Sequence, residues 1–345
     1  MNVLRKILNV AQIRNTDGYT IQHTPIASLD LMENAAKSFV AALEKNHRMH
    51  QKIIVCCGAG NNGGDGLAVC RILQNQGVSV KAILIQFKEL LSKDCEANLK
   101  KLKEVQLLKA GDALPDFSEA DIIIDAVLGS GIRGAVTGFV ADVITAINNA
   151  HAFVYAIDVP SGLPCDSLPT SNCIVKADLV VSFQGPKRSF FFPENSVYIN
   201  NWKVVDIGLN EDFIQEQDSA HFIIDHRIAA LVKKRSRQSH KGTYGHALLL
   251  AGSYGKMGAA ILASKACLRS GVGLVTTSVP QCGYDILQIS VPEALCLIDR
   301  HVNYITTLPL LDSYNAIGIG PGIDTHHQTV QLVQTLLSTS TQPLV

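Results

Sequence analysis

Segments in which apolar residues recur every three or four positions alternate along the chain with short runs that are apolar throughout. The first periodic segment begins at Ser28, which we expect to cap a helix, with Asp30 and Glu33 near its positive end. Its apolar positions lie on one face of that helix: Leu29, Met32, Ala36, Phe39 and Leu43. The pattern therefore predicts an amphipathic helix early in the chain.

Six apolar runs follow and predict strands. They lie at 52–57, 80–85, 121–128, 153–159, 177–183 and 202–207, with helices expected at 67–76, 92–105 and 139–149. Strands that are apolar throughout indicate a mostly parallel sheet covered by helices on both faces. The first part of the chain is thus predicted to be a doubly wound α/β domain.

The same rhythm restarts after an acidic, Gln-rich stretch at 211–218. The new elements are expected at 246–251 (strand), 259–270 (helix), 274–279 (strand) and 316–322 (strand and loop), and the last residues look like the start of another strand. We place the domain boundary in the Gln-rich stretch, giving domains 1–217 and 218–345.

Composition supports two domains and a small-molecule ligand. The 345 residues exceed one average domain, and equal totals of 30 basic and 30 acidic residues provide no field for nucleic acid or a membrane surface. The basic stretch 233–241 is interpreted as a solvated linker. No apolar stretch approaches the ~18 residues that cross a bilayer, and the nine scattered cysteines favour reduced thiols, so a cytoplasmic location is expected.

The Gly-rich segment 58–66 is the first candidate for chemistry. Gly58, Gly60 and Gly63 match the dinucleotide fingerprint, but no acid ends the strand at 80–85, which disfavours an NAD-dependent oxidoreductase. No Gly-Lys-Ser/Thr follows, so the Walker pattern is absent as well. A plain tight turn with Asp65 as helix cap is the simpler alternative.

Two more loops follow strands and carry acids. Asp125 stands in an apolar run before the Gly-rich loop 129–134, and Asp158 ends the next strand before Ser161. Ligands collect at the carboxyl ends of parallel strands, and a buried carboxylate requires a donor or a cation. Turn capping by each acid is the alternative; we favour a binding site.

Four motifs in this order resemble the epimerase domain of bifunctional NAD(P)H-hydrate repair enzymes: LMENA (31–35), CGAGNNGGDG (57–66), DAVLGSGIRG (125–134) and DVPSG (158–162). Ala36 and Ala59 depart from the family, which usually has Gly and Pro there. The resemblance implies a Rossmann-like fold and hydrated NADH or NADPH as substrate. The implied substrate-binding residues are Asn61, Asn62, Gly63, Gly64, Asp65, Gly129, Ser130, Gly131, Ile132, Arg133, Gly134, Ala135 and Asp158.

The resemblance also implies a K+ site with Asn62, Asp125 and Ser161 as ligands, which supply the oxygen donors that hard cations favour. Our hypothesis for the chemistry is that Asp158 acts as the general acid/base at the hydrated ring carbon. The Arg133 guanidinium is suited to a diphosphate.

Residues 240–245 (HKGTYG), 252–259 (GSYGKMGA) and 270–274 (SGVGL) resemble the start of the ADP-dependent dehydratase domain of the same family, a ribokinase-like α/β fold. The resemblance implies ADP as cofactor and substrate contacts at Ala259 and Gly322. The family segment with the anion hole and the acidic base is not found here. We therefore expect an incomplete ADP site and no dehydration by this chain alone.

Two other classes of protein compete with this interpretation. A non-catalytic scaffold with the epimerase fold, as in decapping enhancers, is disfavoured by the intact NNGGDG and DVPSG motifs. A ribokinase-type small-molecule kinase lacks its catalytic segment. We expect hydrated NADH or NADPH as ligand, no nucleic acid or membrane partner, and a homo-oligomer.

Overall fold

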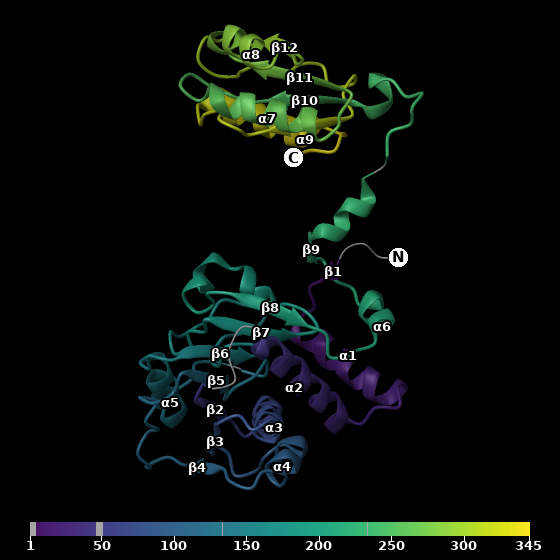
Figure 1. The fold of residues 1–345 in the computed structure, drawn as a ribbon. Coiled ribbons are helices and arrows are strands. Elements are labelled where there is room, and N and C mark those ends of the chain that lie inside the picture. The colour runs from purple at the N-terminus through teal and green to yellow at the C-terminus, as the bar shows by residue number, and fades with distance from the viewer. Residues whose placement is uncertain (1–4, 46–50, 133, 233) are drawn as a thin grey trace. The chain divides into compact units, whose positions relative to one another are not determined.

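The computed structural model describes residues 5–45, 51–132, 134–232 and 234–345 (Figure 1). The chain divides into two compact units, Met1–Val232 and Lys233–Val345, which are described separately. The first unit includes residues beyond position 217, where the sequence placed its end. It does so because β9 (Phe222–Ile223) pairs antiparallel with β1 (Arg5–Lys6).

A seven-stranded sheet forms the centre of the first unit, in the order β4-β3-β2-β5-β6-β7-β8. The strands are β2 (Ile53–Cys57), β3 (Val80–Ile85), β4 (Gln106–Leu108), β5 (Ile122–Ala126), β6 (Phe153–Ile157), β7 (Leu179–Phe183) and β8 (Trp202–Val205). Every neighbouring pair is parallel, which confirms the predicted doubly wound α/β fold.

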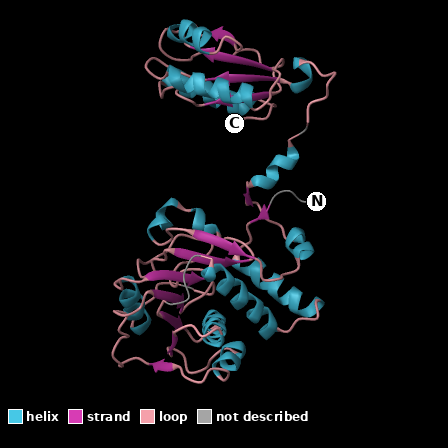
Figure 2. Ribbon diagram, in the orientation of Figure 1, coloured by secondary structure: helices cyan, strands magenta, loops and turns pink. Residues whose placement is uncertain are grey.

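Helices cover both faces of this sheet (Figure 2). On one face α2 (Ser28–Glu44) and α3 (Asn61–Asn75) bury apolar side chains, Phe39 and Leu67 among them, against alternate strand residues; α4 (Lys93–Leu99) packs beside α3. On the other face α5 (Phe139–Asn148) packs on the strand residues that point the opposite way, such as Ile123. The alternation follows from the two-residue period of strands.

Helix α1 (Val10–His23) was not expected from the apolar pattern. It begins with a capping box, in which the Asn9 side chain accepts from Gln12 N and the Gln12 side chain accepts from Asn9 N. Its far end packs on α6 (Glu211–Glu216), where Tyr19 and Phe213 stack with ring centroids 3.9 Å apart. Helix α1 is therefore fixed at both ends within the first unit.

Two local predictions are wrong. The residue that caps α2 is Ala27, which offers no side-chain oxygen, whereas the Ser28 hydroxyl donates to Asp94 Oδ2 at 2.6 Å. Helix α3 starts at Asn61 rather than at residue 67, so most of the Gly-rich segment is helical. Asp65 thus lies inside the helix and does not cap it. The first turn of α3 packs against Gly58 and Met32 so closely that a Cβ on Gly63 or Gly64 would clash.

The second unit contains a parallel four-stranded sheet in the order β12-β11-β10-β13. Its elements are β10 (His246–Leu250), α7 (Met257–Arg269), β11 (Leu274–Val279), α8 (Tyr284–Ser290), β12 (Leu295–Ile298), β13 (Ala316–Ile319) and α9 (His327–Thr339). Leu344 makes a parallel bridge to Ile317, as the apolar last residues suggested. In the part of the chain that the structure describes, no helix is long and apolar enough to cross a membrane.

Gly66 is expected to set how closely α3 approaches the sheet. A Cβ at this position would lie 2.6 Å from Ala126 Cβ and 2.9 Å from Cys57 Sγ. Gly66→Ala should therefore push the helix outward and lower the free energy of unfolding by about 1–3 kcal/mol. Urea unfolding followed by fluorescence of Trp202, the single tryptophan of the chain, measures this for the first unit.

Gly18→Ala is the matched control, because Gly18 also lies inside a helix, α1, and a Cβ there would meet no atom within 4 Å. Its stability should equal that of the wild type or exceed it by up to about 1 kcal/mol, because Ala is the better helix former. If both variants lose the same stability, close packing at Gly66 is not the reason.

Candidate active site

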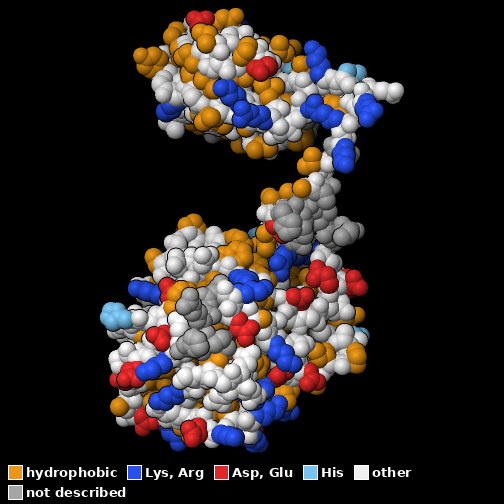
Figure 3. All heavy atoms as spheres, in the orientation of Figure 1, with side chains coloured by type: hydrophobic (Ala, Val, Ile, Leu, Met, Phe, Trp, Pro, Cys, Tyr) orange, Lys and Arg blue, Asp and Glu red, His pale blue; other side chains and the backbone are white. Residues whose placement is uncertain are grey.

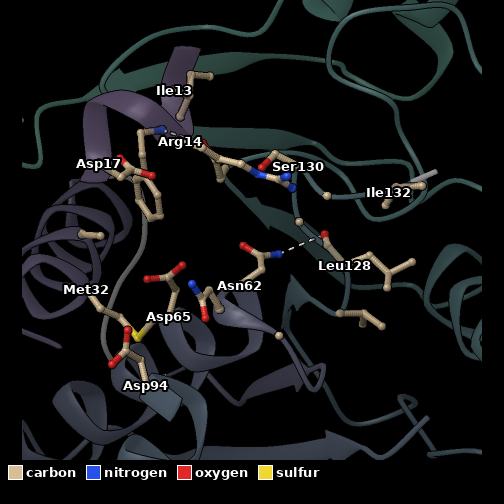
Figure 4. Close-up of a pocket in the computed structure, with 18 of the residues that line it drawn as sticks. Ile13, Arg14, Asp17, Met32, Asn62, Asp65, Asp94, Leu128, Ser130 and Ile132 are labelled. Atoms are coloured by element: carbon tan, nitrogen blue, oxygen red, sulfur yellow. Dashed lines mark hydrogen bonds between the residues drawn. The ribbon is translucent and has the colours of Figure 1, made fainter. Parts of the chain in front are cut away.

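A cavity of about 690 Å³ opens at the carboxyl ends of β2, β5 and β6 (Figure 4). Strand β2 pairs with β3 on one side and β5 on the other, so the chain order reverses at this point of the sheet, where doubly wound folds bind ligands. The predicted site residues that line the cavity are Asn61, Asn62, Asp65, Gly129, Ser130, Gly131, Ile132, Gly134, Ala135 and Asp158.

Gly63 and Gly64 do not line the cavity. A Cβ on Gly63 would lie 1.8 Å from Gly58 O, and one on Gly64 would lie 2.9 Å from Met32 Sδ. Both glycines therefore let α3 start tightly against the preceding backbone and against α2. Arg133 lies outside the described residues.

The first turn of α3 presents backbone amides to the cavity. The bond from Gly64 N to Gly60 O, 3.1 Å long, is the first that an α-helix starting at Asn61 can make. The amides before Gly64 therefore have no acceptor within the helix, and the helix dipole adds partial positive charge at this end. The geometry suits an anionic ligand group, such as a phosphate.

Near the end of β5, the Asp125 carboxylate is completely buried. Ser161 donates to it twice, from Oγ to Oδ1 at 2.5 Å and from the backbone N to Oδ2 at 2.7 Å, and Val127 N donates at 3.2 Å. Burial raises the pKa of Asp125 to about 6, although these hydrogen bonds act in the opposite direction. The pair ties the end of β5 to the segment after β6.

Asn62 joins this pair through the backbone of Leu128. Leu128 N donates to Ser161 Oγ at 2.7 Å, and Leu128 O accepts from Asn62 Nδ2 at 3.0 Å (Figure 4). The structure thus brings Asn62, Asp125 and Ser161 together, all of them buried. Their side-chain oxygens, with the Leu128 carbonyl, form a donor set suited to a hard cation.

Asp158 lies directly after β6 with a left-handed backbone, φ 64°. Its Oδ1 accepts from Phe183 N at 3.0 Å and pairs with Lys187 Nζ at 2.6 Å. The Lys187 side chain is 1% exposed, and that of Asp158 is 17% exposed. A buried ammonium thus holds one oxygen of the carboxylate at the cavity wall.

Lys187 was missed by the sequence analysis, because no motif or spacing singles it out. Asp17 and Arg14 on α1 also line the cavity and were missed together with the helix. The signal that could have found them is the Asn9-x-x-Gln12 capping box.

Acidic side chains gather near Asp158. Burial first, and then the charge of Asp158, raise the pKa of Asp17 to about 6, while Lys187 opposes the shift. Burial and the charges of Asp158, Asp17 and Asp94 raise the pKa of Asp65 well above its usual value. This end of the cavity can therefore hold both a neutral carboxylic acid and an ionised carboxylate at neutral pH.

In the second unit, the two predicted substrate contacts are neighbours. A Cβ on Gly322, whose φ is 69°, would lie 3.0 Å from Ala259 Cβ. The two positions belong to the start of α7 and to the loop after β13.

Comparison with known proteins agrees with both units. The family described as YjeF-related protein N-terminus matches residues 28–189, and the NAD(P)H-hydrate dehydratase family matches residues 247–345. The bifunctional NAD(P)H-hydrate repair enzyme of Coxiella burnetii is 33% identical over 95% of this chain and 67% of its own length. The chain belongs to this repair-enzyme family. The Moorella thermoacetica member is 32% identical over 98% of this chain and 68% of its own length.

The fold of this chain is also similar to that of a solved structure. A crystal structure of the yeast protein YNL200c matches with a TM-score of 0.52 and 21% identity, covering 61% of this chain and 93% of the yeast chain. This chain spans about two thirds of the length of the two curated relatives.

The raised pKa of Asp17 has a consequence for stability. Between pH 3.8, the usual pKa of an aspartate side chain, and about 6, the folded state keeps a proton that the unfolded state has lost. The stabilisation is fully present below 3.8 and is lost as the pH rises through about 6. Asp17→Asn removes this titration, so the stability of the variant relative to wild type should increase across this window and level off above it.

Urea unfolding followed by Trp202 fluorescence, at pH values on both sides of the window, measures the difference. A stability difference that does not change with pH would contradict this account of Asp17.

Proposed function

We propose that the first unit interconverts the two epimers of hydrated NADH or NADPH, with Asp158 as the general acid/base. The observation that carries the proposal is the position of Asp158. Asp158 lines the same cavity as the start of α3 and the loop segment 129–132, and its Oδ1 is paired with the buried Lys187. Family membership supports a hydrated dinucleotide as the ligand.

The contacts of Asp158 assign different roles to its two oxygens. In the described residues, the hydrogen bonds and the ion pair of the side chain all fall on Oδ1, from Phe183 N, Ser182 Oγ and Lys187 Nζ. Oδ2 is therefore left to carry the proton. It gives the proton to the hydroxyl of the hydrated ring carbon as the C–O bond breaks, and it takes the proton back when water adds to the opposite face.

The residues around Leu128 fit a K+ ion. Asp125 is a fully buried carboxylate whose described partners are neutral donors on Ser161 and Val127, so its charge has no cationic partner among the described residues. The donor set consists of oxygens, which alkali cations prefer. A bound K+ would be held by Asn62, Asp125 and Ser161 and would compensate the buried negative charge.

The second unit is proposed to contribute the ADP-dependent dehydratase part of the family, with Ala259 and Gly322 at its substrate site. We propose that it does not complete that reaction alone. Its edge strand β12 exposes the apolar side chains of Leu295 (52%), Leu297 (36%) and Ile298 (53%), and among the described residues no further strand pairs with it.

A non-catalytic scaffold remains the second candidate function, and the epimerisation assay distinguishes it from an enzyme. A homo-oligomeric state, a cytoplasmic location and the lack of nucleic-acid or membrane partners stay predictions, as does the division into domains at 217/218.

Epimerisation should depend on Asp158. Purified protein is added to one resolved epimer of hydrated NADH, and the appearance of the other is followed by chromatography. Asp158→Asn should slow the reaction by about 10²–10⁴-fold, because it removes a proton-transferring group while Asn still tolerates the left-handed backbone.

Asp142→Asn serves as the control, since Asp142 is an exposed acid on α5 outside the cavity, and its rate should match wild type. If wild-type protein epimerises the substrate no faster than the buffer blank does, the non-catalytic scaffold is favoured. If Asp158→Asn epimerises it at the wild-type rate, Asp158 is not the general acid/base.

Potassium should stabilise the first unit by binding the folded state alone. At ten times its dissociation constant, the gain in free energy of unfolding is about 1.4 kcal/mol. Urea unfolding in potassium or sodium chloride of equal ionic strength should show this difference for the wild type. Asp125→Asn should abolish it, because the charge that attracts the ion is gone; identical midpoints for wild type in both salts would count against the ion.

A further inference from the structure

Helix α1 forms a wall of the cavity but lies before residue 28, where the family match begins. Val10 N donates to Asp166 Oδ2 at 3.0 Å at its start, and Tyr19 stacks on Phe213 toward its end. These contacts fix the helix on the unit, and Arg14 and Asp17 are the charged residues that it contributes to the cavity lining.

The Arg14 side chain reaches the Gly-rich loop after β5. A Cβ on Gly131 would lie 3.0 Å from Arg14 Nη2, and Figure 4 shows Arg14 extending toward Ser130. A larger residue at position 131 would require the guanidinium to shift by a few tenths of an ångström. The loop backbone and the guanidinium therefore face the same space.

Within the described ranges, the Arg14 guanidinium makes no hydrogen bond or ion pair, although the residue lies within a cavity that also contains four carboxylates. Its donors remain available to a ligand. A guanidinium binds two oxygens of a phosphate at once, which a point charge does not.

Charge is distributed unevenly in the cavity. The charges of Asp158, Asp17 and Asp94 act on Asp65, and the charge of Asp158 acts on Asp17, so acids gather at the end where the buried Lys187 pairs with Asp158. An anionic part of a ligand is repelled from that end. Arg14 and the exposed Lys88 are the other described cations of the lining.

We propose that Arg14 binds the diphosphate of the dinucleotide, over the loop segment 129–132, and so orients the nicotinamide end toward Asp158. This rests on the proposed function for the identity of the ligand. The loop segment supplies backbone amides to the diphosphate, and Arg14 supplies a positive charge beside them.

The test is direct binding of ADP-ribose, which has the diphosphate but no nicotinamide, measured by titration calorimetry at fixed ionic strength. Arg14→Gln should weaken binding by about 10- to 100-fold, as expected for charge-assisted hydrogen bonds to phosphate. Arg14→Lys should recover part of this loss, because it restores the charge without the two-pronged geometry.

Lys101→Gln is the matched charge control, since Lys101 is exposed and lies outside the cavity lining; its affinity should equal that of wild type. Unfolding midpoints of all variants establish that each is folded. The proposal is overturned if wild type does not bind ADP-ribose, if Arg14→Gln binds as well as wild type, or if Lys88→Gln alone weakens binding.

Binding and epimerisation fail separately. If the protein binds ADP-ribose through Arg14 but does not epimerise hydrated NADH, the proposed function is refuted and the diphosphate subsite still stands. If Arg14→Gln epimerises hydrated NADH with an unchanged KM, the subsite is refuted and the proposed function still stands.

Discussion

The buried carboxylate of Asp125 is the constraint on which the site depends. A carboxylate without exposed surface must find donors, and it finds them on Val127 and Ser161, in the segments that follow β5 and β6. Ser161 in turn accepts from Leu128 N, and Leu128 O accepts from Asn62 at the start of α3. One acid thus links the ends of three neighbouring strands, and the cavity between them takes its shape from these bonds.

Much of this arrangement could be predicted from the sequence. The apolar runs identified the parallel strands, and the rule that ligands collect at the carboxyl ends of strands pointed to Asp125 and Asp158 before any contact was known. For the segment 61–66 the sequence predicts a loop, because glycine weakens isolated helices. In the fold, the contacts of Gly63 with Gly58 and of Gly66 with Ala126 outweigh that local preference.

The charged residues that complete the site could not be predicted in the same way. Lys187 pairs with Asp158 only because β6 and β7 are neighbours, and nothing in its local sequence marks it as buried. Arg14 and Asp17 depend on the docking of α1, a helix with a weak apolar pattern that long-range contacts hold in place. Tertiary partners, rather than spacing, determine these positions.

The docking of α1 bears on the order in which the protein folds. Its partner Phe213 on α6 follows Tyr19 by about two hundred residues, so a chain synthesised from its amino end exposes this helix long before that partner exists. Contacts of such sequence separation form slowly, after local ones. We therefore expect the wall that carries Arg14 to close late, after the buried carboxylate network, because the bond from Ser161 N to Asp125 spans only 36 residues of sequence.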